Sequence, residues 1–143
     1  MRYLFLESKA MELIAYKLDQ IIQDQHGNVK IPQMSMDDYD RLQKAIEILD
    51  NNFENPPGLF DLAKYIGTTH SRLNFCFRKV YHTTAFGYLR QIRLEKAKQL
   101  LEKEGLNVTQ AAYSVGYSSV PSFSKAFLKY FGMNPTKFVK KIF

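Results

Sequence analysis

The chain has 143 residues, 45% of them hydrophobic, and a formal net charge of +6. This length suits one domain of ordinary size or two very small ones, and the apolar content is sufficient for a core. No tract approaches the roughly 18 consecutive apolar residues of a membrane-spanning helix, and no small-residue cleavage site marks a signal peptide. The single cysteine, Cys76, excludes an internal disulfide and favours a reducing, cytoplasmic compartment.

The positive charge is unevenly distributed along the chain. Residues 1–56 hold 6 Lys and Arg against 10 Asp and Glu, a net charge of −4, whereas residues 57–143 hold 14 against 4, a net charge of +10. A basic half of this density indicates an anionic partner, with nucleic acid first and a membrane surface second. Charge alone leaves a solvated basic surface without any partner as the alternative.

The acidic part predicts two helices separated by a linker. Apolar residues recur at helical spacing over 2–25 and form a stripe at 4–22 that is broad for a surface helix. The stretch "HGNVKIPQM" at 26–34 is typical of a linker. Ser35 and Asp38 resemble a capping box, so a second helix is expected to run to about Phe53. We therefore divide the chain into an N-terminal amphipathic helix with its linker, 1–34, and a domain over 35–143.

After the break "NPPG" at 55–58 the expected helices become short. We expect helices over 59–67 and 69–81, a long one over 84–104, and another over 108–116. A further helix ends at Gly132, and Asn134-Pro135 begins a last one. No segment alternates in the manner of a strand, so the expected fold class is all-α. The expected capping residues are Thr83 or Thr84, Asn107 with Gln110, and Ser118 or Ser119.

A repeat lies inside the basic half. The run "AKYIG" at 63–67 matches "AYSVG" at 112–116, 49 residues later. Leu73, Phe77 and Lys79 match Phe123, Phe127 and Lys129, 50 residues later, so the second turn is one residue longer. Two copies of a short helix, a turn and a helix carrying cations are typical of a duplicated helix-turn-helix.

In a DNA-binding helix-turn-helix, the first helix supports the second against the major groove. Gly67 and Gly116 can supply the permissive turn angles, and the outward face of each second helix must reach bases and phosphates. Asn can form two hydrogen bonds with adenine, and Arg or Lys can bond guanine or phosphate. The outward residues are His70, Ser71, Asn74, Arg78 and Lys79 in the first copy, and Ser119, Val120, Pro121, Ser122, Lys125 and Lys129 in the second.

The second copy differs in its chemistry. Val120 and Pro121 carry no side-chain donors, so base reading there is expected to use thymine methyl contacts and DNA shape. An ordinary helical bundle with exposed polar residues remains the alternative for both copies. Two tandem copies in a basic half favour DNA binding over that alternative.

The basic half resembles the C-terminal DNA-binding domain of the AraC/XylS family of bacterial transcription regulators. The resemblance covers roughly 40–143 and is carried by "YLRQIRLEKAKQLL" at 88–101, "VTQAAYSVGYSSVPSFSKAFLKYFGMNP" at 108–135 and the first copy at 59–81. It implies two helix-turn-helix subdomains, about 59–81 and 108–131, joined by the long helix, with both recognition helices in successive major-groove segments. A helix of about 20 residues spans about 30 Å, close to the roughly 34 Å of one duplex turn.

The family pattern also implies roles for single residues. It places base contacts at Ser71, Asn74 and Phe75, although many members have Arg where this chain has Phe75. It usually has glycine after the first recognition helix, where this chain has His82. In the second helix, Val120, Pro121, Ser122 and Lys125 match the positions of base contacts, and polar residues are commoner at the first two. Ser71, Arg72, Asn74, Ser122 and Lys125 are therefore the expected base or near-base contacts.

The segment "RYLFLESKAMELIAYKL" at 2–18 resembles the helix that ends the effector domain in the pyochelin-regulator-like branch of the family. If so, the chain is a fragment or short form without the ligand-binding domain. The apolar stripe at 4–22 either folds back on its own domain or pairs two chains. The expected partners are double-stranded DNA, RNA polymerase and, through that helix, a second copy of the chain.

Catalytic and metal sites are not expected. The three histidines are scattered, and no H-E-x-x-H, C-x-x-C or glycine-rich phosphate loop occurs. Cys76 between two phenylalanines is typical of a buried small hydrophobe. The sequence therefore predicts a non-enzymatic, sequence-specific DNA-binding protein without cofactors. A helical protein-interaction module that uses the 4–22 stripe, and a non-specific architectural DNA binder, are the alternatives.

Overall fold

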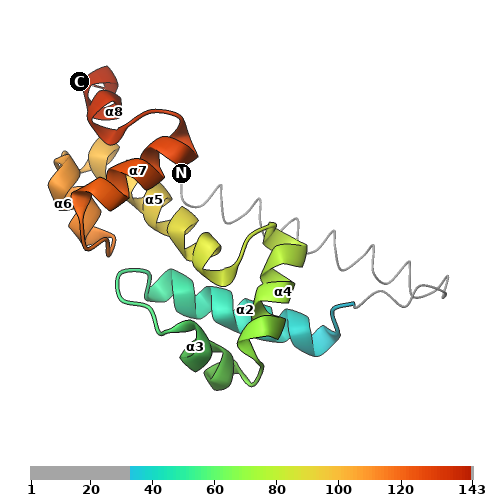
Figure 1. The fold of residues 1–143 in the computed structure, drawn as a ribbon. Coiled ribbons are helices and arrows are strands. Elements are labelled where there is room, and N and C mark those ends of the chain that lie inside the picture. The colour runs from blue at the N-terminus through green and yellow to red at the C-terminus, as the bar shows by residue number, and fades with distance from the viewer. Residues whose placement is uncertain (1–32, 143) are drawn as a thin grey trace. The chain divides into compact units, whose positions relative to one another are not determined.

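A computed structural model describes residues 33–142 (Figure 1), and these residues form helices and no strand. The expectation of an all-α fold class is confirmed. The expected helix at 2–25 and its apolar stripe lie outside the described residues. The helices are α2 (Met36–Asn51), α3 (Leu59–Ile66), α4 (His70–Tyr81), α5 (Ala85–Lys103), α6 (Val108–Ser114), α7 (Val120–Phe131) and α8 (Pro135–Ile142).

The described residues form two compact units. The first unit combines 33–48 with 58–88, and the second unit combines 49–57 with 89–142. Helices α2 and α5 each contribute residues to both units, and each unit contains one helix-turn-helix: α3 with α4, and α6 with α7. Two capped helix pairs with their own cores explain why the short helices form here, because helices of this length are marginal without tertiary packing.

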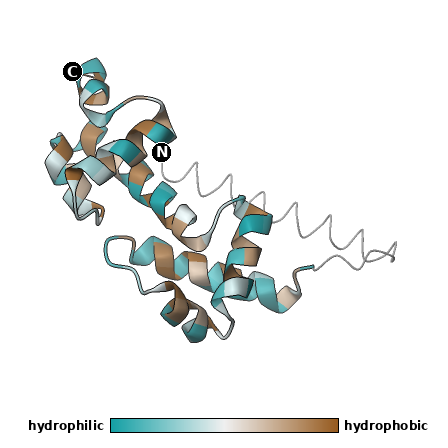
Figure 2. Cartoon of the chain, viewed as in Figure 1, coloured by the Kyte–Doolittle hydropathy of each residue, from teal (hydrophilic) through white to brown (hydrophobic). Residues whose placement is uncertain are grey.

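The core of the first unit is built on an aromatic cluster. The rings of Phe77 and Tyr88 lie 5.6 Å apart, and Tyr81 lies 5.9 Å from the first and 5.0 Å from the second. Leu62 from α3 and Leu73 from α4 are fully buried in the same unit. The apolar sides of these helices face inward in Figure 2, which fixes which side of α4 remains outside.

The second unit repeats this arrangement. Phe127 lies 5.7 Å from Phe123, 4.5 Å from Phe131 and 5.6 Å from Phe138, which begins the inner face of α8. Leu94, Ala97 and Leu101 from α5 complete the buried cluster together with residues of α6. Phe123, Phe127 and Phe131, spaced four residues apart, share one packed face of α7, and the third is only partly buried.

Most predicted helix ends are confirmed, and each has a local cause. The side chain of Ser35 accepts from the Asp38 N–H while Asp38 accepts from the Ser35 N–H, which is the predicted capping box. The predicted ends of α2 at about Phe53 and of α6 at 116 lie two residues beyond the observed ends, Asn51 and Ser114; after α6 the chain turns at Gly116, where φ is 98°. Thr69 caps α4, which was not predicted, and the confirmed caps are Thr84, Asn107 with Gln110, Ser119 and Asn134.

The hydrogen bonds of the two turns match one for one. Thr68 N–H donates to the Ala63 carbonyl, and Tyr117 N–H, 49 residues later, donates to the Ala112 carbonyl. Each bond closes a Schellman motif around a glycine with positive φ, 83° at Gly67 and 98° at Gly116. The predicted repeat is therefore also a repeat of backbone geometry.

The structure extends the repeat beyond what the sequence analysis identified. His82 and Gly132, 50 residues apart, both end their recognition helices with positive φ, 58° and 82°. The aromatic pair Phe77–Tyr88 corresponds to Phe127–Phe138, with 5.6 Å between the ring centroids in both. The start of α5 therefore corresponds to α8.

The helix before each pair also repeats. The run "RLQKAIEIL" at 41–49 of α2 matches "RLEKAKQLL" at 93–101 of α5, 52 residues later, and the leucines and alanine in the shared positions are buried in both. This match is visible in the sequence itself, but the repeat predicted above covered only 63–79 and 112–129 and so did not include it. Each unit is one copy of a four-helix pattern, and α5 ends the first copy and begins the second.

Candidate nucleic-acid interface

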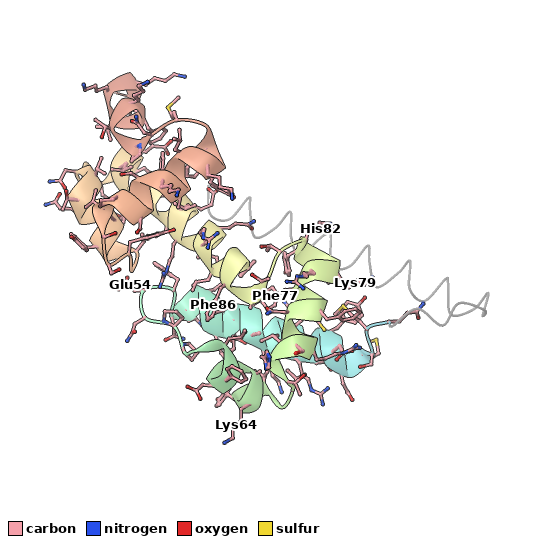
Figure 3. All side chains as sticks on the ribbon, in the orientation of Figure 1. Glu54, Lys64, Phe77, Lys79, His82 and Phe86 are labelled. Atoms are coloured by element: carbon pink, nitrogen blue, oxygen red, sulfur yellow. The ribbon has the colours of Figure 1, made fainter. Side chains whose placement is uncertain are left out.

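Helix α4, the first recognition helix, buries one side and exposes the other. Thr69 accepts from the Arg72 N–H at 3.2 Å and starts the helix, so its first N–H groups are satisfied. Leu73, Cys76, Phe77 and Val80 are buried. The predicted contact residues lie away from this side: Ser71 and Arg78 are exposed, and His70, Arg72, Asn74, Phe75 and Lys79 are partly buried. Figure 3 shows Phe77 and Lys79 on different sides of the helix.

Arg72 is bound within the protein. Its Nε donates to Asp38 Oδ1 at 3.3 Å, and its Nη2 donates to Asp38 Oδ2 at 2.5 Å and to the Gln33 carbonyl at 2.8 Å. Burial works to raise the pKa of the Asp38 carboxyl, but the hydrogen bonds from Arg72 and Ser35 outweigh it and hold that pKa below its ordinary value. The sequence predicted Arg72 as a base contact, but in the structure its Nε and Nη2 donate to Asp38 of α2 and to the Gln33 carbonyl just before it.

Asn74 is also used inside the protein. Its Oδ1 accepts from the Ala85 N–H at 3.0 Å and so satisfies the first amide of α5. Bidentate recognition of adenine uses the same oxygen, so Asn74 could read a base in this way only by sharing its Oδ1 between the base and the α5 amide. In the second copy the corresponding residues are Ser124 and Pro135, 50 residues later, and proline has no N–H to satisfy.

Phe75 occupies the half-exposed edge of α4 between two cations. The guanidinium of Arg72 lies 4.6 Å from the centroid of its ring, and the ammonium of Lys79 lies 5.5 Å from it. These cation–π contacts hold an apolar ring beside positive charge at the surface. Such a ring can contact a thymine methyl or a sugar while the cations contact phosphate.

His70 begins α4 and is packed at its start. Its ring lies 4.2 Å from the ring of Phe60, which is 70% exposed on α3, and its Nε2 lies 3.4 Å from Ser71 Oγ. The stack places His70 at the junction of the two helices. Ser71 remains exposed beside it, with a hydroxyl that can donate or accept.

Helix α7, the second recognition helix, begins with a different surface. Ser119 Oγ accepts from the Ser122 N–H and also donates to Ser122 Oγ at 2.9 Å, so the two hydroxyls are linked. Val120 is partly buried and Pro121 is exposed, which leaves an apolar edge at the first turn. Lys125 and Lys129 are exposed on the side away from Phe123 and Phe127.

The other cations of both recognition helices have no acidic partner among residues 33–142. Arg72 forms the one salt bridge there, so Arg78, Lys79, Lys125 and Lys129 have no carboxylate of the described residues within 4.0 Å. Their charge is therefore available to an external anion. This is the arrangement by which a recognition helix contacts phosphates.

In 33–142 no group of three or more His, Cys, Asp or Glu could hold a metal ion, and no helix is long and apolar enough to cross a membrane. Cys76 is buried, and burial raises the pKa of its thiol to about 11, which disfavours the reactive thiolate.

A helix-turn-helix domain family matches residues 62–141. A solved AraC-type transcriptional regulator from Chromobacterium violaceum superposes with a TM-score of 0.67 at 27% identity, over 72% of this chain and 92% of that one. The chain belongs to the AraC/XylS family. The predicted resemblance is confirmed, and with it an AraC/XylS-type DNA-binding domain of tandem helix-turn-helix fold. This family is one of transcription regulators and is not an enzyme class.

Among AraC/XylS-type relatives, the regulator GbdR of Pseudomonas aeruginosa is 30% identical over 130 residues, which is 91% of this chain and 35% of that protein. PchR of the same species is 36% identical over 107 residues, 75% of this chain and 36% of that protein. The chain thus spans about a third of these relatives. The DNA-binding domain of AdpA, solved with a target DNA, shares the fold, with a TM-score of 0.64 at 20% identity over 71% of this chain and 91% of that one. Assignment to the pyochelin-regulator-like branch stays a prediction.

Proposed function

We propose that the whole protein is a bacterial transcription regulator that acts in the cytoplasm and reads a specific duplex through α4 and α7, in successive major-groove segments. The observation that carries the proposal is the pair of capped recognition helices, each with cations outside its buried face that form no salt bridge within the described part of the chain. Cations on a helix that fits the major groove bind phosphates, and the side chains beside them contact bases. This arrangement therefore supports both affinity for DNA and recognition of its sequence. We propose no enzymatic activity.

The contacts are divided between the two helices. Arg78 and Lys79 of α4, with Lys125 and Lys129 of α7, contact phosphates and fix the register. The intramolecular bonds of Arg72 and Asn74 favour a different set of base readers from the one expected from sequence. We assign base reading to Ser71 and Phe75 in the first copy and to Ser122 in the second, with methyl contacts from Val120 and Pro121. Ser119 and His70 support these positions.

The test is a selection of bound sequences from a random duplex pool, followed by titration of the enriched duplex. We expect one enriched motif with two half-sites and a binding constant that falls steeply with salt. Unrelated DNA of the same length should compete at least a thousandfold less well, the low end for specific binders. Equal competition would reject sequence-specific reading and support the architectural alternative. No binding at low salt would support the protein-interaction alternative.

Matched variants separate positioning from reading. Lys125→Ala should weaken binding to the enriched and the unrelated duplex equally and reduce the slope of log K against log salt by about 0.9. Ser71→Ala should weaken binding to the enriched duplex alone.

Dimerisation through the 4–22 stripe and contact with RNA polymerase remain proposals, which sedimentation of the full chain and binding to purified polymerase would test.

A further inference from the structure

Helix α4 is braced against the start of α2 by a contact with no assigned role in DNA binding. Arg72 uses both Nε and Nη2 on the two oxygens of Asp38, a side-on pair with fixed geometry. The same Nη2 reaches the Gln33 carbonyl, and Asp38 also accepts from the Ser35 N–H at 2.9 Å. The residues that lead into α2, and its first turn, are thus linked to the third residue after the α4 cap.

Breaking this brace to free Arg72 for DNA would be costly. The Asp38 side chain is only 5% exposed, against 34% for Arg72. If Arg72 moved to a DNA phosphate, a buried carboxylate would be left without its partner, which is strongly destabilising. Arg72 is therefore not expected to bind a DNA phosphate. The contact instead affects the orientation of α4.

The brace controls the rotation of α4 about its own axis. The buried side of α4 consists of apolar contacts, which tolerate small rotations because they are not directional. With side chains, a helix has a radius of about 5–6 Å, so a rotation of about 10° moves a surface atom by about 1 Å. Recognition geometry tolerates only about 0.5 Å. Arg72 lies between the buried side and the exposed Ser71, so its directional bonds to Asp38 set this angle together with the bond that Asn74 accepts from the Ala85 N–H.

The second unit has no equivalent of this brace. The residue corresponding to Arg72 is Ser122, 50 positions later, and the residue corresponding to Asp38 is Arg90, 52 positions later. Serine and arginine cannot form an ion pair. The shared four-helix pattern therefore folds without the brace, so folding alone does not account for it in the first unit.

We propose that Asp38 is a positioning residue for DNA reading: through Arg72 it fixes the orientation of α4, so that Ser71 and Phe75 meet the base edges in register while Arg78 meets a phosphate. The proposal rests on the proposed function, because it names what sets the accuracy of that reading. Asp38 itself contacts no DNA.

The test compares Asp38→Asn with Asp37→Asn in the full chain. Both variants remove one negative charge from the first turn of α2, and Asp37 is exposed. Asparagine at 38 keeps an acceptor for the Ser35 N–H, so the cap is retained. Binding is measured on the enriched duplex and on a scrambled duplex of the same composition. Residual dipolar couplings of the α4 amides, referred to α2 and α3, report the helix orientation.

In Asp37→Asn we expect both affinities to rise together and the couplings to stay unchanged. In Asp38→Asn we expect the ratio of the two affinities to fall about tenfold, equivalent to the loss of one base contact, with changed couplings for α4. An unchanged ratio or unchanged couplings in Asp38→Asn would overturn the proposal. If wild-type protein does not discriminate between duplexes, the proposed function fails, and the couplings still decide the orientation of α4.

A second variant covers a failure of Asp38→Asn to fold. Asp38→Asn with Arg72→Gln removes both charges, so neither is left buried without a partner. We expect this pair to fold and to show the same tenfold loss of selectivity. A double variant with wild-type selectivity would overturn the proposal as well.

Discussion

Replacing Gly116 by alanine should destabilise the second unit far more than the equivalent change at Gly67 destabilises the first unit. The two glycines occupy matching turns, with φ 98° and 83°. A Cβ at Gly67 would meet nothing within 4 Å, whereas a Cβ at Gly116 would lie 2.5 Å from the Glu54 carbonyl oxygen and 2.9 Å from Arg93 Nη2. The pair therefore separates backbone strain, which both share, from steric conflict, which only Gly116 has.

The neighbours of Gly116 cannot move aside easily. Glu54 presents a backbone oxygen, and Arg93 is held by a 2.7 Å hydrogen bond from its Nε to the Phe53 carbonyl. Arg93 is partly buried, and this burial lowers the pKa of its guanidinium. Left-handed angles destabilise the folded state of a non-glycine residue by about 1–2 kcal/mol. Replacing glycine also reduces the conformational entropy of the unfolded chain, which stabilises the protein by about 0.4–1 kcal/mol. Overpacking adds about 1–3 kcal/mol.

We therefore expect Gly67→Ala to cost about 1 kcal/mol and Gly116→Ala about 3 kcal/mol. Urea unfolding followed by circular dichroism gives each value against wild type, provided that each transition is assigned to its unit by a tyrosine signal. DNA affinity measured well below the transition controls for loss of fold. Equal costs within about 0.5 kcal/mol, near the additivity error of such measurements, would refute the steric reasoning.

Three further predictions concern single side chains. His82→Gly should raise thermal stability by about 0.5–1 kcal/mol, because His82 carries φ 58° at the end of α4, and a lower midpoint would contradict this strain. The pKa of Asp38 is lowered in the folded state, so its contribution to stability is complete above the unfolded-state pKa of about 3.9 and is lost as pH falls through the folded value. Asp38→Asn should therefore remove part of the acid dependence of the free energy of urea unfolding. An identical pH profile in the variant would argue against the ion pair. Asn74→Ala should cost about 1–2 kcal/mol, because the Ala85 N–H loses its acceptor; a stability equal to wild type would return Asn74 to the base-reading set.

The sequence alone predicted the all-α class, both helix-turn-helix pairs and nearly every helix cap, because these features depend on interactions within four or five residues. Ser35, Asn107 and Ser119 bond amides three positions away, and Gly67 and Gly132 adopt angles that other residues resist. The apolar spacing of α7 likewise fixed its buried side before any packing partner was known.

The tertiary structure decided which polar side chains on a recognition helix are free. Arg72 and Asn74 have the chemistry of base readers, but their partners, Asp38 and the Ala85 amide, lie 34 and 11 residues away in the chain. Local pattern carries no information about such bonds. By contrast, Arg78 and Lys125 stay unpaired because no carboxylate among the described residues is within reach, which again only the fold determines. The sequence by itself thus determined where the helices begin, end and bury their faces, and long-range hydrogen bonds determined which of their outward groups remain for DNA.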